Sequence, residues 1–254
     1  MPALATDLVN RKVDVLVAMA NSAALAAKAV TTTIPVVFAI GGDRVKLGLV
    51  ESLNRTGGNI TGVSFFLTQL ESKRLGLLHE LVPHATEIAV LINATQPDAS
   101  DQENEVKEAA QALGLDVHIV HAASESDLEP AFATCAQLRA GGLLVTSDPF
   151  FNVVNKQIIA LAARNALPAI YEFHEYVEIG GLASYGSSPT EAFYQTGVYA
   201  GDILGGAKAA DLPAVQTTKF ELAINLKTAK VLGLEVPLQP VRTCRLRVRI
   251  CCSA

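Results

Sequence analysis

The stretch Gly141-Gly-Leu-Leu-Val-Thr-Ser-Asp-Pro-Phe-Phe151 decides the fold class of this chain. Residues 143–146 form a short run between a glycine pair and an Asp-Pro step, which is typical of a strand covered on both faces. A helix is predicted to begin at Pro149, so Ser147 and Asp148 lie between the strand and the helix. Open α/β sheets bind small ligands at this end of their strands. Asp148 is therefore the first candidate for a residue that contacts a ligand.

The same alternation of strand and helix runs along most of the chain. Strands are predicted at residues 13–19, 34–40, 59–64, 87–92, 116–120, 143–146, 167–172, 182–185 and 218–226. Helices separate most of them and no hairpin turns are evident, which favours parallel sheets. We therefore predict an α/β protein with two Rossmann-like lobes and a hinge, rather than one nine-stranded sheet. The first lobe would comprise residues 1–64 and 186–215, and the second lobe residues 65–185 and 216–235.

Composition excludes several classes of protein. The 254 residues carry a formal net charge of −5, which argues against a nucleic-acid partner, because such proteins usually present a basic surface. No run of ~18 apolar residues occurs, so we expect no direct membrane span. Residues 1–9 lack the basic segment and apolar core of a signal peptide.

Residues 236–254 differ in composition from the rest. The fourteen residues after Pro240 contain four Arg, three Cys and no acidic residue, whereas the body of the protein has only Cys135. We predict an irregular, unpacked tail. The alternatives are an anchor on an anionic surface or an intermolecular disulfide.

The helix that follows the first strand differs from the others at its start. It begins with Asn21 and Ser22, and its first turn is small and neutral. Its free N–H groups and positive dipole end suit an anion such as a ligand carboxylate. The alternative is that Asn21 or Ser22 simply caps the helix. By contrast, four helices are predicted to begin with a capping box: Thr68 with Glu71, Ser100 with Glu103, Ser126 with Glu129, and Ser188 with Glu191.

Other candidate ligand-binding residues lie where predicted strands end. Asp148 could accept a hydrogen bond from a ligand ammonium group, although Asp148 and Asp43 could instead cap the helices that follow them. Aromatic residues there could stack on a ligand or belong to the packing of the core. The remaining candidates are Asn93, Ser147, Phe150, Tyr171, Glu172 and Tyr185. The sequence shows none of the HExxH, GxSxG, P-loop or GxGxxG motifs, so we expect no enzyme activity, metal or cofactor.

Several segments together resemble the ABC-transporter substrate-binding proteins of the tryptophan/tyrosine-binding type. These segments are IPVVFAIGGD (34–43), LNRTGGNITGVS (53–64), AIYEF (169–173), GGLASYG (180–186) and KFELAINLKTAK (219–230), and the resemblance extends over residues 2–237. It implies the type I periplasmic binding protein fold, in which a cleft between two lobes captures a small solute such as an amino acid for a membrane permease. By matching position, Asn21, Ser22 and Asp43 would face the cleft from the first lobe. Ser147, Asp148, Tyr171, Glu172 and Tyr185 would face it from the second lobe and hinge.

The resemblance also implies more chain than this sequence contains. Members of the family usually begin with a signal peptide and one further strand–helix unit, so we expect an incomplete first lobe. The family location is periplasmic or lipid-anchored, and retention in the cytoplasm is the alternative for a chain without a signal peptide. Two other functions stay open: a ligand-sensing domain of a regulator, and a non-functional truncated copy of the binding protein. A helix-turn-helix segment would identify a regulator, and the sequence shows none.

Overall fold

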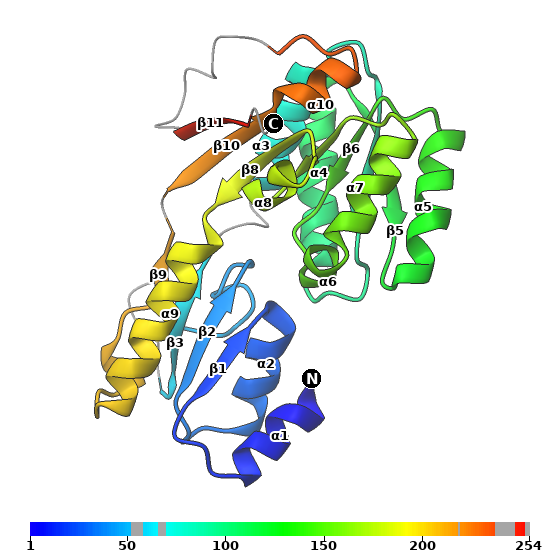
Figure 1. Ribbon diagram of the computed structural model, residues 1–254. Coiled ribbons are helices and arrows are strands. Elements are labelled where there is room, and N and C mark those ends of the chain that lie inside the picture. Colours follow the sequence, from blue (N-terminus) through cyan, green and yellow to red (C-terminus); the bar gives the residue numbers. More distant parts are fainter. Residues whose placement is uncertain (52–57, 66–69, 218, 237–246, 252–254) are drawn as a thin grey trace. The chain divides into compact units, whose positions relative to one another are not determined.

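The computed structural model describes residues 1–51, 58–65, 70–217, 219–236 and 247–251. The chain forms two compact units (Figure 1). Unit 1 comprises Met1–Phe66 and Pro189–Thr218, and unit 2 comprises Leu67–Ser188 and Lys219–Ala254. The sequence placed the lobe boundaries after residues 64, 185 and 215. Both units combine helices with sheets, which confirms the predicted α/β class.

The sheet of unit 1 is parallel among the described residues. Its strand order is β1-β2-β3-β9. The strands are β1 (Leu16–Met19), β2 (Val36–Ile40), β3 (Ile60–Ser64) and β9 (Val215–Gln216). The first three begin later than predicted, and the short β9 was not predicted.

Helices cover both faces of this sheet (Figure 1). They are α1 (Pro2–Asn10), α2 (Asn21–Val30), α9 (Pro189–Leu204) and the short 3₁₀ helix η2 (Ala209–Asp211). Phe38 packs in one core cluster with Ala24 of α2, and its neighbour Val37 packs in another with Tyr199 and Ile203 of α9. Consecutive residues of β2 thus serve opposite faces, as the pleat of a strand requires.

Gly62 occupies a position in β3 that excludes every other residue type. Its φ is +154°, and a Cβ there would lie 2.1 Å from the carbonyl oxygen of Phe38 on the neighbouring strand. A separation that short is far inside van der Waals contact, so only glycine lets β2 and β3 approach as they do.

The sheet of unit 2 has the strand order β11-β10-β8-β7-β6-β4-β5. The strands are β4 (Glu87–Ile92), β5 (Asp116–His121), β6 (Gly142–Val145), β7 (Ala169–Tyr171), β8 (Ala183–Ser187), β10 (Phe220–Asn225) and β11 (Arg247–Cys251). All neighbours pair in parallel except β8 and β10, which are antiparallel. The prediction of parallel sheets is therefore wrong for this one pair.

The prediction of an irregular tail is wrong for residues 247–251. These residues form β11, which pairs in parallel with β10, so that Arg247 lies opposite Glu221. The open backbone edge of β10 can accept another strand whatever its side chains are, and composition therefore gave no indication of this pairing. The rest of the predicted tail after Val236 lies outside the described residues.

The two faces of the unit 2 sheet are covered by different helices (Figure 1). Leu78 of α3 packs in one core cluster with Leu144, whereas Phe132 of α5 and Ile158 of α7 pack in the other with Leu143. The helices are α3 (Glu71–Leu81), α4 (Ala99–Leu113), α5 (Glu125–Gln137), α6 (Pro149–Val153), α7 (Asn155–Arg164), α8 (His174–Glu178) and α10 (Leu226–Val231). The single helix predicted from Pro149 is thus divided into α6 and α7.

Two of the four predicted capping boxes need correction, and a third includes a residue outside the part of the chain that the structure describes. Helix α5 begins with a capping box formed by Ser124 and Asp127, two residues before the predicted one. Helix α4 follows Asp98 with no side-chain cap, and the predicted partner of Glu71, Thr68, lies outside the described residues. Helix α9 begins at Pro189, as predicted.

Candidate functional site

In unit 1 the start of α2 has the neutral character predicted for it. The first turn contains no acidic residue, and no side chain caps the helix. The Asn21 side chain is buried and instead accepts a hydrogen bond from the Gly42 N–H at 3.1 Å. Asn21 therefore ties the loop after β2 to the start of α2, and the alternative that it caps its own helix is wrong.

Asp43 follows β2 and turns the chain locally. Its Oδ1 accepts hydrogen bonds from the Val45 N–H at 2.7 Å and the Lys46 N–H at 3.2 Å. Asp43 therefore caps a turn, because its carboxylate satisfies free backbone donors there, whereas the helix predicted after it is replaced by turns and bends over residues 44–51. Ser22 and Asp43 are both half-buried.

In unit 2 Asp148 is the N-cap of α6 and is 2% exposed. Its Oδ1 accepts hydrogen bonds from the Phe150 N–H at 2.8 Å, the Phe151 N–H at 3.3 Å and the Asn93 Nδ2 at 3.3 Å. The second oxygen, Oδ2, is buried and has no hydrogen-bond partner among the described residues. Burial raises the pKa of Asp148, because the ionised carboxylate loses its water, although these three hydrogen bonds oppose the shift. Asp148 thus caps its helix and also keeps one oxygen without a donor.

Asn93, which follows β4, lies beside Asp148 as the strand order requires, because β4 and β6 are neighbours. Its own Oδ1 accepts hydrogen bonds from the Thr95 N–H at 3.1 Å and the Thr95 hydroxyl at 2.7 Å. These bonds fix the orientation of the amide so that its Nδ2 donates to Asp148.

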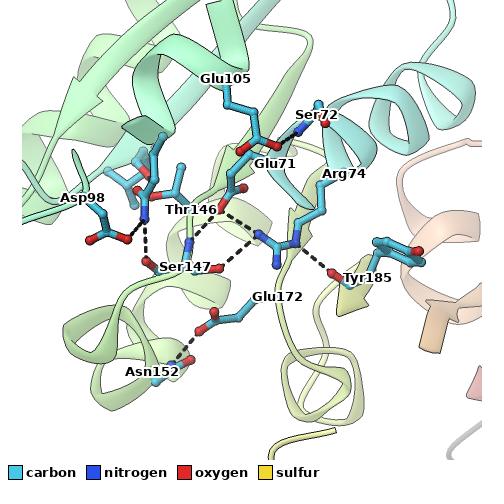
Figure 2. Close-up of polar contacts among 12 residues, drawn as sticks. Glu71, Ser72, Arg74, Asp98, Glu105, Thr146, Ser147, Asn152, Glu172 and Tyr185 are labelled. Carbon is cyan, nitrogen blue, oxygen red and sulfur yellow. Dashed lines mark hydrogen bonds and ion pairs between the residues drawn. The ribbon is translucent and has the colours of Figure 1, made fainter. Parts of the chain in front are cut away.

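Ser147 is held by a buried ion pair from α3 (Figure 2). Arg74 Nη1 lies 2.8 Å from Glu71 Oε1, and both side chains are fully buried. The same Glu71 oxygen accepts the Ser147 N–H at 3.0 Å, while Arg74 Nη1 donates to Ser147 Oγ at 3.1 Å. Arg74 Nε also donates to the Tyr185 carbonyl oxygen on β8 at 2.7 Å.

Glu172, directly after β7, is 3% exposed and belongs to the same network. Its Oε1 accepts a hydrogen bond from Asn152 Nδ2 at 2.6 Å, and Asn152 Oδ1 accepts the Tyr176 hydroxyl at 2.9 Å. Burial raises the pKa of Glu172 to about 7, against the opposing effects of the Arg74 charge and of hydrogen bonds from Ser147 and Asn152. Glu172 therefore changes its charge near neutral pH.

The buried charges of unit 2 do not balance. Among its described residues they are Glu71, Arg74, Asp98, Asp148 and Glu172, which makes four carboxylates and one cation. Buried carboxylates are costly unless a cation or a proton compensates them. Together with the unpartnered Oδ2 of Asp148, this excess favours a cationic group at these strand ends.

The aromatic candidates have different environments. Tyr171 is 1% exposed, belongs to a core cluster and stacks on Tyr176 with ring centroids 4.6 Å apart, which favours the packing alternative for this residue. Tyr185 is 3% exposed and stacks on Phe220. Phe150 is half-buried at the start of α6, beside Asp148.

Sequence reasoning missed Arg74 and assigned Glu71 to a cap. A signal for both was present, because Glu71, Arg74, Leu75 and Leu78 share the i, i+3, i+4, i+7 spacing of one helix face. Charged residues on the apolar stripe of a helix indicate a buried pair. No group of three or more His, Cys, Asp or Glu that could hold a metal occurs in the part of the chain that the structure describes.

Comparison with known proteins identifies the family. The model of the family described as "ABC transporter substrate binding protein" matches residues 2–239. The chain belongs to this family. It is a family of solute-binding proteins and not of enzymes, as the sequence predicted.

Two relatives of this substrate-binding protein have informative names. A "Tyrosine-binding protein" of Clostridioides difficile (strain R20291) is 28% identical over 238 residues, which are 91% of this chain and 66% of that protein. This chain therefore spans less than two thirds of that relative's length. The crystal structure of an ABC domain of Streptococcus pneumonia in complex with L-Trp is 26% identical, with a TM-score of 0.82, and covers 93% of this chain and 81% of that one.

More distant structures share the fold of this substrate-binding protein alone. A LacI family transcriptional regulator from Bifidobacterium animalis subsp. lactis DSM 10140 has a TM-score of 0.58 at 12% identity, over 84% of this chain and 77% of that one. The fold is that of the type I periplasmic binding proteins, as predicted. None of the described helices combines the length and the apolar character that crossing a membrane demands.

Proposed function

We propose that this protein is the solute-binding component of an ABC importer that captures an aromatic amino acid and delivers it to a membrane permease. The observation that carries the proposal is the buried Asp148 carboxylate, whose Oδ2 has no hydrogen-bond partner among the described residues. A ligand ammonium group is the natural donor for such an oxygen, because charge-assisted hydrogen bonds are the strongest of their kind. The excess of buried carboxylates in unit 2 supports the same assignment.

In this proposal Asp148 accepts the ammonium group of the amino acid, and Ser147 and Glu172 line the same strand ends of unit 2. In unit 1 the neutral start of α2, at Ser22, suits an anion such as a carboxylate, because it offers free backbone N–H groups and the positive end of the helix dipole. Asp148 Oδ2 is shielded from solvent, so side chains around it must move when the ligand enters.

An aromatic amino acid is the ligand class that the relatives favour, because one is named for tyrosine and another was crystallised with L-Trp. Membership of the family supports a periplasmic location and a permease partner in the same way.

Fluorescence titration tests the proposal directly. The chain contains no Trp, so the emission of L-tryptophan can be followed without a background from the protein. We expect saturable binding of L-tryptophan or of L-tyrosine, the latter measured by calorimetry, and none of a non-amino-acid control such as ribose. A wild-type protein that binds no amino acid would contradict the proposed function.

The Asp148→Asn variant tests the ammonium site. Asparagine keeps an oxygen that can cap α6 but removes the negative charge, so folding is retained while binding weakens about 10- to 100-fold, the equivalent of ~1.5–3 kcal/mol. The matched control is Asp116→Asn, which changes an exposed Asp at the start of β5. Equal affinity of Asp148→Asn and wild type for a zwitterionic ligand would remove this role from Asp148.

A further inference from the structure

Arg74 lies at the centre of the polar network that surrounds Ser147 in unit 2 (Figure 2). We propose that Arg74 is a positioning residue for ligand binding: it holds Ser147, and through Ser147 the carboxylates of Asp148 and Glu172, in the arrangement that accepts the ligand's ammonium group. The inference rests on the function proposed above and assigns a role in it to a residue that never touches the ligand.

Ser147 is fixed by hydrogen bonds at its hydroxyl and at both of its backbone polar groups. Its Oγ accepts from Arg74 at 3.1 Å, and its N–H donates at 3.0 Å to the Glu71 oxygen that Arg74 also binds. Its carbonyl oxygen accepts from Gln102 Nε2 at 3.0 Å. Every polar atom of Ser147 is therefore hydrogen-bonded to a residue of α3 or α4, and these bonds also fix the position of the adjacent Asp148.

The hydrogen bonds of Ser147 run in one direction, from Arg74 towards Glu172. Because Ser147 Oγ accepts from Arg74, its hydroxyl hydrogen is available to Glu172, whose pKa this bond lowers. On its other side Glu172 accepts from Asn152, which in turn accepts from Tyr176. Two chains of hydrogen bonds thus end on the Glu172 carboxylate, and the one that begins at Arg74 carries a positive charge.

The Arg74 guanidinium reaches across neighbouring strands of the sheet. Arg74 bonds to Ser147 after β6 and to the Tyr185 carbonyl on β8, and its charge acts on Glu172 after β7. The planar fork of arginine can serve these directions together, whereas a lysine ammonium is a single point of charge. One side chain therefore acts on three neighbouring strands: on β8 itself and on the residues that directly follow β6 and β7.

The experiment removes both members of the ion pair at once. Arg74→Met alone would leave Glu71 buried and unpaired, and such losses unfold many proteins. The double variant Glu71→Met/Arg74→Met replaces the pair by apolar side chains of similar size, an exchange that proteins often tolerate. The matched control is Glu129→Met/Arg164→Met, which makes the same exchange at the exposed ion pair between α5 and α7.

We expect the buried double variant to keep its far-UV circular dichroism and to bind L-tryptophan at least ten-fold more weakly than wild type. The control double variant should bind within two-fold of wild type. Equal affinity in the buried double variant and wild type would overturn the inference while leaving the proposed function intact. A wild type that binds no amino acid would overturn both.

The pH profile separates positioning from a merely structural role. The groups that act on Glu172 are Arg74 and Glu71 from α3, Ser147 after β6, Asn152 of α6 and Tyr176 of α8. Binding of an ammonium group favours ionised Glu172, so wild-type affinity should rise with pH through about 7. The double variant removes the charge of Arg74, which lowers the pKa of Glu172, and that of Glu71, which raises it to a smaller extent, so the midpoint should move to higher pH. A variant that binds weakly but keeps the wild-type midpoint would overturn the role of Arg74 in controlling this carboxylate.

Discussion

Glu172 gives the sharpest test of how burial controls this network, through the pH dependence of stability without ligand. Burial raises its pKa from 4.5 to about 7 in the folded protein. Because the folded state favours the proton, Glu172 contributes stability that is fully present below about pH 4.5 and is lost as pH rises through about 7. A difference of roughly 2.5 pKa units corresponds to about 3 kcal/mol at 1.36 kcal/mol per unit.

The perturbation is Glu172→Gln, which is neutral at every pH and keeps an oxygen that can accept from Asn152. Its absolute stability can change by about 1 kcal/mol because one hydrogen-bond geometry is altered. The informative quantity is the change with pH. Between about pH 5 and pH 8, wild type should lose about 2 to 3 kcal/mol more free energy of unfolding than the variant.

Urea titrations followed by far-UV circular dichroism at several pH values measure this difference. The matched control is Glu108→Gln on the exposed face of α4, which should follow the wild-type pH curve. Parallel curves for Glu172→Gln and wild type would refute the reasoning, because they would mean that the folded protein holds Glu172 with its ordinary proton affinity.

Two further predictions concern backbone packing and the loop after β2. Gly62→Ala should prevent unit 1 from folding, because its Cβ would lie 2.1 Å from the Phe38 carbonyl oxygen. The control Gly76→Ala in α3 meets no atom within 4 Å and should stabilise the protein by up to about 1 kcal/mol. Thermal melts of the two variants test this difference. A folded Gly62→Ala variant would contradict the described approach of β2 and β3. Asn21→Ala should lower the free energy of unfolding by about 1–3 kcal/mol, because the Gly42 N–H loses its acceptor. Asn21→Asp keeps an oxygen at that position and should retain the wild-type stability. Urea titrations of the two variants measure the difference.

The sequence carried enough information for the class and the order of the elements. Residues 87–92 form β4 as predicted, because a run of buried apolar residues with a turn on each side leaves a strand few alternatives. Asp148 was recognised because it stands between a strand and a helix, a position fixed by local sequence. The neutral start of α2 was recognised for the same reason.

The missed features depend on contacts between distant residues. Arg74 meets Ser147 and the Tyr185 carbonyl, which are 73 and 111 residues away in the chain. Tyr171 is the last residue of β7, and the sequence left open whether it stacks on a ligand or packs in the core; the structure places its ring against Tyr176 in a core cluster. No local pattern states which face of a strand meets which helix, and so these assignments needed the structure.

The division of unit 1 between two stretches of chain has a consequence for its biosynthesis. Strands β1, β2 and β3 leave the ribosome before unit 2, whereas α9 begins about 125 residues and β9 about 150 residues after the end of β3, an interval of about 6–30 s at ordinary translation rates. During that interval the face of β2 that carries Val37 has no cover, whereas β4 to β8 of unit 2 emerge without interruption. The segment that carries β1 to β3 is therefore a natural client for chaperones, and β4 to β8 are the strands that can pack together first.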